Sequence, residues 1–400
     1  MRRQRQLFLL VSGLSTMGSF AGLTAKAWVL MDGTNNPLLL ALHFALLSLP
    51  TLVVSGPAGV VTDREGCEPV LIRAQWGLFA GALVGAAAMP LSRGTAQAVL
   101  LLLSTLVVGV ASAYELTARN KYCALLVENG AELGSYLTSF SLVFNIGKLI
   151  GPPVGGWLVT LAGPGLALLL DALSYLLPIL AVLLLLRPDR TREERSRPGH
   201  GTSLGAAWRL CGADLRHVLA FTGLFCLVGF FHPGLAPLVA RTVVGPRASD
   251  LGLLTSVIAA GSISGGVVLQ RWSRPLSRRP GLLLGTSALL TALAQMGMGL
   301  GRGQGWGLAM AYLIGAGTAV LLAGCNLVTQ VASPQVLRGR MAGLGQIAFL
   351  GGGGLSGLLA AGLSLRIGLA ATFTLLGAAG GTLAAMELLR RSGRRLPPAA

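Results

Sequence analysis

The chain has 400 residues, of which 53% are hydrophobic and only 11% are charged. So few charged side chains could not cover the surface of a water-soluble fold of this size. A net charge of +17 would suit a soluble protein that binds nucleic acid, but here the basic residues flank long apolar runs, which argues against such a partner. We therefore expect an all-α membrane protein that lies in a lipid bilayer.

Apolar runs of roughly 20 residues recur along the chain, and a helix of about that length crosses a hydrocarbon core of roughly 30 Å. The first run is too long for a signal peptide and lacks a small-residue cleavage site before the second run, so it is interpreted as a span. The sequence predicts twelve spans, at residues 7–31, 37–61, 70–92, 96–117, 134–160, 163–186, 217–240, 251–270, 281–300, 305–329, 342–364 and 368–389.

The basic residues indicate how these spans are oriented. An even number of spans places both termini on the same side of the membrane. Only five of the 31 Lys and Arg residues fall on the opposite side, namely Arg93, Arg241, Arg247, Arg302 and Arg366. Because the side rich in Lys and Arg faces the cytoplasm, both termini are predicted to be cytoplasmic.

The longest connection, residues 187–216, is rich in Arg, Glu, Pro and Gly and separates six spans from six. We expect an N-terminal six-helix bundle at residues 1–186, a cytoplasmic linker at 187–216, and a C-terminal six-helix bundle with a short cytoplasmic tail at 217–400. The two halves also repeat each other, because residues 58–64 at the end of the second span match residues 265–271 at the end of the eighth. Such internal repeats are typical of secondary transporters.

Glycines gather on four of the predicted spans. Glycine at positions i and i+4 lets two helix backbones approach closely, and lipid offers no hydrophobic drive that could replace this contact. We expect the second, fifth, eighth and eleventh spans to meet across the two halves through these glycines. The alternative is that glycine is simply common in this chain, which has 57 of them. The clustered positions are Gly56, Gly59, Gly151, Gly155, Gly156, Gly261, Gly265, Gly266, Gly351 to Gly354 and Gly357.

Two sequence motifs resemble those of the major facilitator superfamily. Residues 59–66, GVVTDREG, are similar to the G-x-x-x-D-R-x-G motif that follows the second span in that family. Residues 147–156, GKLIGPPVGG, are similar to the G-x-x-x-G-P-x-x-G-G motif of the fifth span in exporters. The matching positions are Gly59, Asp63, Arg64 and Gly66 in the first motif, and Gly147, Gly151, Pro152, Gly155 and Gly156, with Lys148 between them, in the second.

Two further stretches, residues 171–175 and Pro334 with residues 338–340, resemble the bacterial branch of siderophore (enterobactin-type) and macrolide exporters. The chain departs from the superfamily at residues 67–69, CEP, where two basic residues usually follow the first motif. It also lacks, in residues 101–113, the basic residue that drug–proton antiporters carry in the middle of the fourth span.

The resemblance implies two six-helix bundles around a central cavity, with transport by alternating access in a bacterial inner membrane. It implies that Asp63 and Arg64 latch the halves shut on the inner side, with Arg338 and Arg340 at the start of the eleventh span as partners. The alternative is that Asp63 and Arg64 are a solvated pair in a loop. The resemblance favours export of a small organic molecule. Two rivals stay open, namely import of a metabolite and a sensor or assembly protein that keeps the fold without transporting.

Ionisable residues inside the spans are candidates for coupling or substrate binding, because each costs at least roughly 2.5–3.5 kcal/mol in a bilayer core. Lys148 and Asp171 could form a structural ion pair or a protonatable couple. Lys26 could face the cavity, or it could snorkel to the interface near Asp32. If Lys26 and Lys148 both face the cavity, an anionic or amphiphilic substrate would be favoured.

Two other polar residues are weaker candidates. Glu115 lies four residues before Arg119, so it could form a helix-surface ion pair or carry a proton. His232 lies in the middle of the seventh span, beside Pro233 and near Pro237, and these prolines should kink the helix. A bend that moves during gating is one interpretation, and a packing role for His232 is the other.

The sequence lacks the motifs that would indicate ATP-driven transport, a metal site or enzymatic catalysis. No G-x-x-x-x-G-K-[ST] loop is present, so we expect an ion gradient, most simply of protons, to drive transport instead of ATP. The five cysteines show no metal-ligand spacing, and no nucleophile–base pair stands out. The sequence therefore predicts a protein that is not an enzyme and needs no metal or cofactor.

Overall fold

The computed structural model describes residues 2–127, 130–186, 208–209, 211–277, 279–301, 303–331 and 338–391. Pro334 and most of the predicted linker, residues 187–207 and 210, lie outside these ranges. The described residues are helical throughout, with short turns between helices and no strand. Within them, twelve helical segments are long and apolar enough to cross a membrane, which confirms the predicted number of spans.

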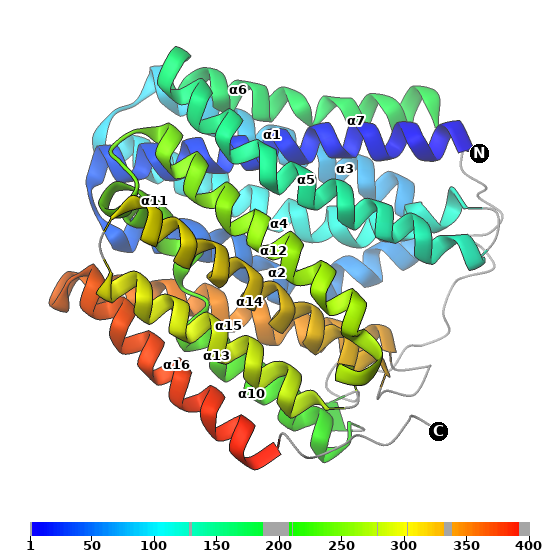
Figure 1. Cartoon of the computed structure of the whole chain (residues 1–400). Coiled ribbons are helices and arrows are strands. Elements are labelled where there is room, and N and C mark those ends of the chain that lie inside the picture. Colours follow the sequence, from blue (N-terminus) through cyan, green and yellow to red (C-terminus); the bar gives the residue numbers. More distant parts are fainter. Residues whose placement is uncertain are drawn as a thin grey trace. The chain divides into compact units, whose positions relative to one another are not determined.

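The chain divides into two compact units, one made of Met1–His200 with Pro246–Ser256, and the other of Gly201–Gly245 with Val257–Ala400. The first six spans belong to the first unit (Figure 1). Their helices are α1 (Arg2–Thr34), α2 (Pro37–Glu65), α3 (Cys67–Leu91), α4 (Gly94–Leu125), α5 (Gly130–Ala162), α6 (Pro164–Ser174), α7 (Leu176–Leu180) and the π-helical turn η1 (Ala181–Leu185).

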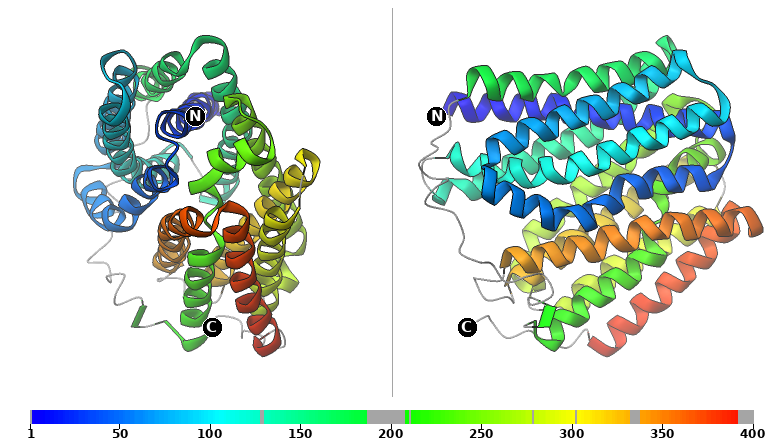
Figure 2. Two further views of the ribbon diagram at one scale, coloured as in Figure 1. Left: turned by 90° about the vertical axis from the view of Figure 1, so that its left-hand side faces the viewer. Right: turned by 180° about the vertical axis from the view of Figure 1, so that it is seen from behind.

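The seventh to twelfth spans are α10 (Ala213–Gly229) with α11 (His232–Val243), α12 (Ala248–Ser277), α13 (Pro280–Leu300), α14 (Gln304–Val331), α15 (Arg338–Ile367) and α16 (Leu369–Arg391). The first residues of α12 are grouped with the first unit, where the Ser256 hydroxyl donates to the Leu149 carbonyl at 2.6 Å. In the second unit, α15 runs along α10, and α16 packs on α13 (Figure 2).

The helix ends follow from local chemistry. Asn36 caps α2, since its side-chain oxygen accepts a hydrogen bond from the Leu38 amide at 2.9 Å, and Pro37 opens the helix. Gly66 joins α2 to α3 with φ at 92°, a backbone conformation that glycine adopts without strain. This turn gives a physical reason for glycine at the last position of the motif at residues 59–66.

Two glycines of the fifth span, Gly151 and Gly155, correct one expectation, because they face α1 of their own unit. For Gly156 the expected contact between the fifth and eighth spans is present, since a Cβ added there would collide with the Ala248 carbonyl oxygen at the start of α12. A Cβ added at Gly151 would lie 2.6 Å from the Met17 carbonyl oxygen, and one added at Gly155 would lie 2.7 Å from the Ala21 Cα. The glycine motif therefore brings α5 against α1, where the backbones come too close for any side chain.

The same holds in the second unit. A Cβ added at Gly265 of α12 would lie 2.6 Å from the Ala316 carbonyl oxygen of α14, and one added at Gly352 of α15 would lie 2.6 Å from the Gly223 carbonyl oxygen of α10. The expectation that these glycines meet across the two halves is wrong for these positions. Close packing inside each bundle is the reason, since each glycine removes the side chain that would separate two neighbouring helices.

Candidate functional site

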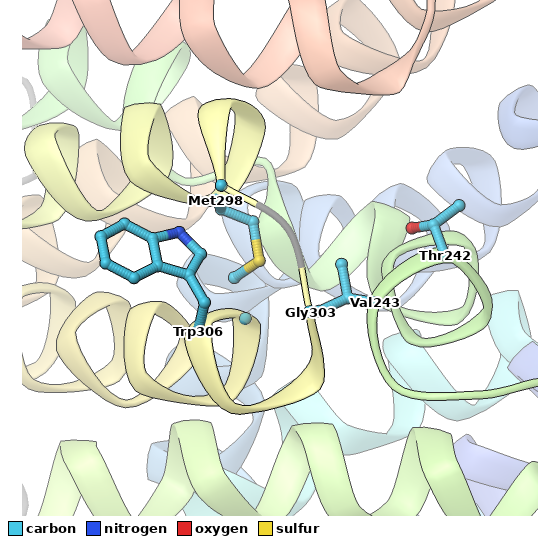
Figure 3. Close-up of a pocket in the computed structure, with 7 residues that line it drawn as sticks. Thr242, Val243, Met298, Gly303 and Trp306 are labelled. Carbon is cyan, nitrogen blue, oxygen red and sulfur yellow. The ribbon is translucent and has the colours of Figure 1, made fainter.

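A pocket of about 300 Å³ lies in the second unit, at the ends of α11 and α13 and the start of α14 (Figure 3). The Trp306 indole forms part of its wall and donates a hydrogen bond to the Gly297 carbonyl at 2.6 Å. None of its described lining residues is charged, and none is a predicted site residue. The lining consists of Thr242, Val243, Met298, Gly301, Gly303, Trp306 and Gly307. These residues provide no charged group that could bind an ion or couple transport to a gradient.

Lys26 of α1 lies in the interior of the first unit. Its side chain is 1% exposed, and its ammonium donates a hydrogen bond to the Ser104 hydroxyl of α4 at 2.8 Å. Ser104 in turn donates to the Gly81 carbonyl of α3 at 2.6 Å. Gly85 of α3 leaves room for the lysine stem, because a Cβ there would lie 3.0 Å from Lys26 Cε. The snorkelling alternative for Lys26 is therefore wrong, since its charge is held among helices.

Asp171 of α6 is the acid that faces Lys26. It is 3% exposed, and its carboxylate attracts the Lys26 ammonium electrostatically, although the two do not form a direct ion pair. Tyr175, one turn further on, is a hydrogen-bond partner of the carboxylate, but the Oδ1 atom of Asp171 has none. Gly22 of α1 lets the acid approach, because a Cβ there would lie 2.6 Å from Asp171 Cβ.

The structure thus places Asp171 with Lys26 and not with Lys148. Lys148 is half-buried on α5, and the described residues provide no hydrogen-bond or ion-pair partner for it. The proposed contact between Lys148 and Asp171 is absent because Asp171 is turned toward α1, as its contact with Gly22 shows. A side chain's direction around a helix decides such pairs, and sequence spacing alone does not reveal it.

Three polar residues of this cluster, His43, Ser104 and Thr105, were not singled out in the sequence. His43 of α2 is 6% exposed, and its Nδ1 atom shares a hydrogen bond with the Thr105 hydroxyl of α4 at 2.8 Å. His43 also lies within electrostatic reach of Lys26. Ser104 and Thr105 are two adjacent polar residues between apolar residues of the fourth span. This pair was the signal in the sequence that could have indicated a buried polar cluster. Five helices, α1, α2, α3, α4 and α6, contribute to the cluster.

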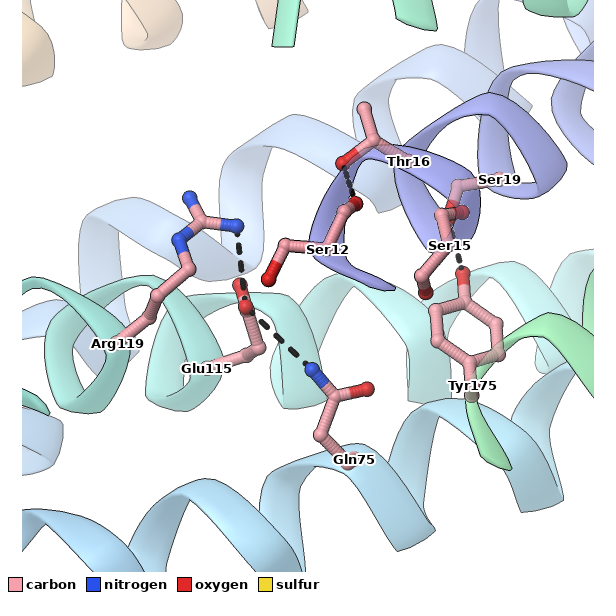
Figure 4. Close-up of polar contacts among 8 residues, drawn as sticks. All are labelled: Ser12, Ser15, Thr16, Ser19, Gln75, Glu115, Arg119 and Tyr175. Atoms are coloured by element: carbon pink, nitrogen blue, oxygen red, sulfur yellow. Dashed lines mark hydrogen bonds and ion pairs between the residues drawn. The ribbon is translucent and has the colours of Figure 1, made fainter. Parts of the chain in front are cut away.

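Glu115 belongs to a second polar cluster, nearer the end of the first unit at which α1 begins (Figure 4). Its carboxylate pairs with the Arg119 guanidinium at 3.0 Å, the i,i+4 contact that the spacing predicts, and Gln75 of α3 approaches it at 3.5 Å. The Arg119 guanidinium also lies 5.4 Å from the centre of the Phe140 ring of α5. Both partners of the ion pair are thus held by packing, and the arrangement favours a structural role.

Figure 4 also shows how Tyr175 is held between α1 and the sixth span. The Ser19 hydroxyl donates to the Tyr175 hydroxyl at 2.8 Å, and Ser174 donates to the Asp171 carbonyl at 2.7 Å. Helix α6 ends at Ser174 and α7 begins at Leu176, since Pro178 cannot donate the hydrogen bond that would continue the helix. The helix is therefore interrupted beside Asp171.

The motif at residues 59–66 lies where α2 ends. Asp63 forms an ion pair with Lys121 at the end of α4 in the same unit, while Arg64 is exposed. Asp63 thus has a partner that the latch hypothesis did not include. Arg338 and Arg340 lie in the first turn of α15, and their side chains lie outside the described residues.

We expect Lys121→Ala to lower the free energy of unfolding by less than about 1 kcal/mol, because exposed ion pairs contribute little. The side chains of Lys121 and Asp63 are 41% and 38% exposed. Thermal unfolding in detergent would measure the change. A loss of several kcal/mol would mean that this pair is shielded from solvent.

His232 begins α11, where the seventh span is interrupted. Its side chain is 6% exposed, and its ring meets the Phe230 ring edge-on at 5.0 Å between centroids. The kink predicted from Pro233 is present as a full break between Gly229 and His232. Among the described residues, no three His, Cys, Asp or Glu side chains come together in a way that could hold a metal ion.

Two solved structures share this arrangement of helices. The chain superposes on the nucleoside transporter NupG with a TM-score of 0.78, covering 96% of this chain and 99% of that one at 13% identity. It superposes on a POT family transporter with a TM-score of 0.74, covering 97% and 96% of the two chains at 13% identity. These likenesses confirm the predicted fold class.

Sequence relatives cover almost the same length. The chain is 24% identical over 377 residues to the multidrug efflux pump Tap of Mycolicibacterium fortuitum, covering 92% of this chain and 91% of the relative. It is 23% identical over 374 residues to the protein of the same name in Mycobacterium tuberculosis (strain ATCC 25618 / H37Rv), covering 92% and 88%. The family model described as transmembrane secretion effector matches residues 4–398. The chain therefore belongs to this family of the major facilitator superfamily and is an integral membrane transporter of small molecules, not an enzyme.

Proposed function

We propose that this transporter exports a small organic molecule and that the inward movement of protons drives the export. Two observations support export over the rival of metabolite import. The relatives from both mycobacterial species are described as multidrug efflux pumps. The motif at residues 147–156 is similar to that of exporters and forms the seam between α5 and α1.

The observation that carries proton coupling is the buried pair of Lys26 and Asp171. A carboxylate in a bilayer core is costly unless it is paired, and Asp171 has one oxygen without a hydrogen-bond partner. Protonation would remove its charge and its attraction for Lys26, whose ammonium would keep its bond to Ser104. Proton binding at Asp171 would thus change the force between α1 and the interrupted sixth span.

The charge of the substrate is a separate part of the proposal. Because Lys26 is covered, the case for an anionic or amphiphilic substrate now depends on Lys148, which is half-buried and lacks a partner among the described residues. Uptake of a fluorescent carboxylate dye and of a lipophilic cation into inverted vesicles would compare the two classes. A preference for the cation that survives Lys148→Gln would reject the anionic substrate.

Orientation completes the proposal. With both termini in the cytoplasm of a bacterial cell, α1 would begin at the inner face, and Lys26 and Asp171 would lie nearer the outer face. Two reporter enzymes fused in turn at residue 400 would test this orientation. One is active only in the cytoplasm, and the other is active only outside it. Activity of the outside reporter would reverse the orientation and, with it, the direction in which protons reach Asp171.

The decisive experiment is substrate transport in proteoliposomes with and without a pH gradient. We expect Asp171→Asn to abolish transport driven by the pH gradient and to retain substrate exchange without a gradient, because an amide cannot carry the proton. Asp250→Asn is the matched control, since Asp250 lies outside the cluster and accepts a hydrogen bond from the Arg247 amide.

Each rival makes a distinct prediction in the same assay. Gradient-driven transport that is unchanged in Asp171→Asn would remove Asp171 from the coupling mechanism. Accumulation of substrate on the side from which an exporter would remove it would favour an importer. A folded wild-type protein without any flux would favour a sensor or an assembly factor.

A further inference from the structure

The seventh span is broken at its centre, and one missing hydrogen bond accounts for the break. Helix α10 ends at Gly229 and α11 begins at His232. In a continuous helix, the amide of residue 233 would donate to the carbonyl of Gly229, four residues earlier. Pro233 has no N–H, so the Gly229 carbonyl loses this donor. In the interior of a membrane protein, no bulk water replaces it.

A side chain from a neighbouring helix supplies the missing donor. The Gln295 amide nitrogen of α13 donates to the Gly229 carbonyl oxygen at 2.6 Å. Gln295 is completely buried, and its Oε1 atom has no hydrogen-bond partner. A glutamine in an apolar helix is costly unless its polar atoms are used. The only hydrogen bond of this side chain among the described residues is therefore the one that compensates for Pro233.

The other contacts at the break are between rings. The Phe230 ring lies 4.4 Å from that of Phe349 on α15, and the Phe231 ring lies 4.7 Å from that of Phe373 on α16. Gly353 makes room for Phe230, because a Cβ at Gly353 would collide with its ring. Ring contacts are weakly directional compared with hydrogen bonds, so the two helix segments can tilt across them at small cost.

We propose that Gln295 is a positioning residue for a hinge at residues 229–233, about which α11 tilts relative to α10 during transport. An intrahelical hydrogen bond would fix the helix geometry, whereas a glutamine with three rotatable side-chain bonds keeps hold of the Gly229 carbonyl while the angle changes. The inference depends on the chain being a transporter. It is independent of export and of proton coupling at Asp171.

The test compares Gln295→Leu, which removes the donor at similar volume, with Pro233→Ala, which restores the backbone N–H. Spin labels at Leu224→Cys on α10 and Thr242→Cys on α11 would report the distance across the break, since both positions are exposed. The five native cysteines are buried, and protein without the introduced pair measures background labelling. Pulsed electron paramagnetic resonance in nanodiscs then gives the distribution of distances.

We expect a broad distribution in the wild type, a narrower one in Pro233→Ala, and a broader or shifted one in Gln295→Leu. In the double variant, Gln295→Leu with Pro233→Ala, the distribution should match that of Pro233→Ala. The restored N–H of residue 233 then donates to the Gly229 carbonyl, so loss of the Gln295 donor has no further effect. Pro237→Ala is the matched control, since its missing bond concerns the carbonyl of residue 233 and not that of Gly229.

Two results would overturn the hinge. One is an unchanged distribution in Pro233→Ala, which would mean that the break is rigid. The other is an effect of Gln295→Leu that is the same whether residue 233 is proline or alanine. If Gln295→Leu alone fails to fold, the comparison of Pro233→Ala with the double variant still decides, because both retain a donor for the Gly229 carbonyl.

Discussion

Replacing Lys26 by methionine is expected to destabilise the protein by up to about 3–5 kcal/mol, because the buried Asp171 carboxyl group then loses its counter-charge and has either to stay charged or to take up a proton. Asp171→Leu alone should cost a similar amount, since it leaves the Lys26 ammonium uncompensated. Both residues are at most 3% exposed, so neither isolated charge can be hydrated without disrupting the bundle. Thermal and denaturant-induced unfolding in detergent micelles would measure the losses.

The double variant, Lys26→Met with Asp171→Leu, shows whether the two residues stabilise the fold as a pair or independently. Methionine and leucine together remove both charges and keep the volume, so most of the stability lost in the single variants should return. The exposed pair of Asp63 and Lys121 provides the control, with a coupling below about 1 kcal/mol. Losses that simply add in the Lys26 and Asp171 double variant would show that the two charges do not interact.

Function should not return with stability in that double variant. If Asp171 carries the proton, the refolded double variant would still lack gradient-driven transport. If the pair only joins α1 to α6, transport would return together with stability. The two roles that the sequence left open for Asp171 are thus separated by measuring unfolding and transport on the same three proteins.

Gly155→Ala is expected to prevent normal packing of α5 on α1, because the added methyl group would lie 2.7 Å from the Ala21 Cα and even closer to its carbonyl oxygen. Backbone atoms cannot rotate away as a flexible side chain can, so the helices have to separate. Overpacking of this kind costs about 1–3 kcal/mol or more. We expect a lower melting temperature in detergent and a lower yield of folded protein in the membrane.

Gly59→Ala is the matched control, because a Cβ at Gly59 of α2 would meet nothing within 4 Å. There the substitution should be neutral or slightly stabilising, since alanine has a higher helix propensity than glycine. Within one helix, Gly265→Ala and Gly266→Ala offer the same contrast, as only Gly265 faces a backbone. Equal melting temperatures for Gly155→Ala and the wild type would show that α1 and α5 have room to adjust.

Several features of the protein could be deduced from local sequence. Composition and run length gave the twelve spans, because crossing a bilayer imposes the same length and polarity on every helix. Pro233 predicted the interruption of the seventh span, because a proline removes the same hydrogen bond wherever it stands in a helix. The spacing of Glu115 and Arg119 predicted their ion pair, since residues four apart share a helix face.

Contacts between distant helices were decided only by the tertiary structure. Asp171 faces Lys26 and not Lys148, and Gly155 packs on α1 of its own bundle, because the rotation of each helix about its axis selects its neighbours. Gln295 gave no signal in the sequence, since its use depends on a carbonyl that another span leaves without a donor. A rule that acts within one helix can be deduced from the sequence, whereas a partnership between helices exists only once they are packed.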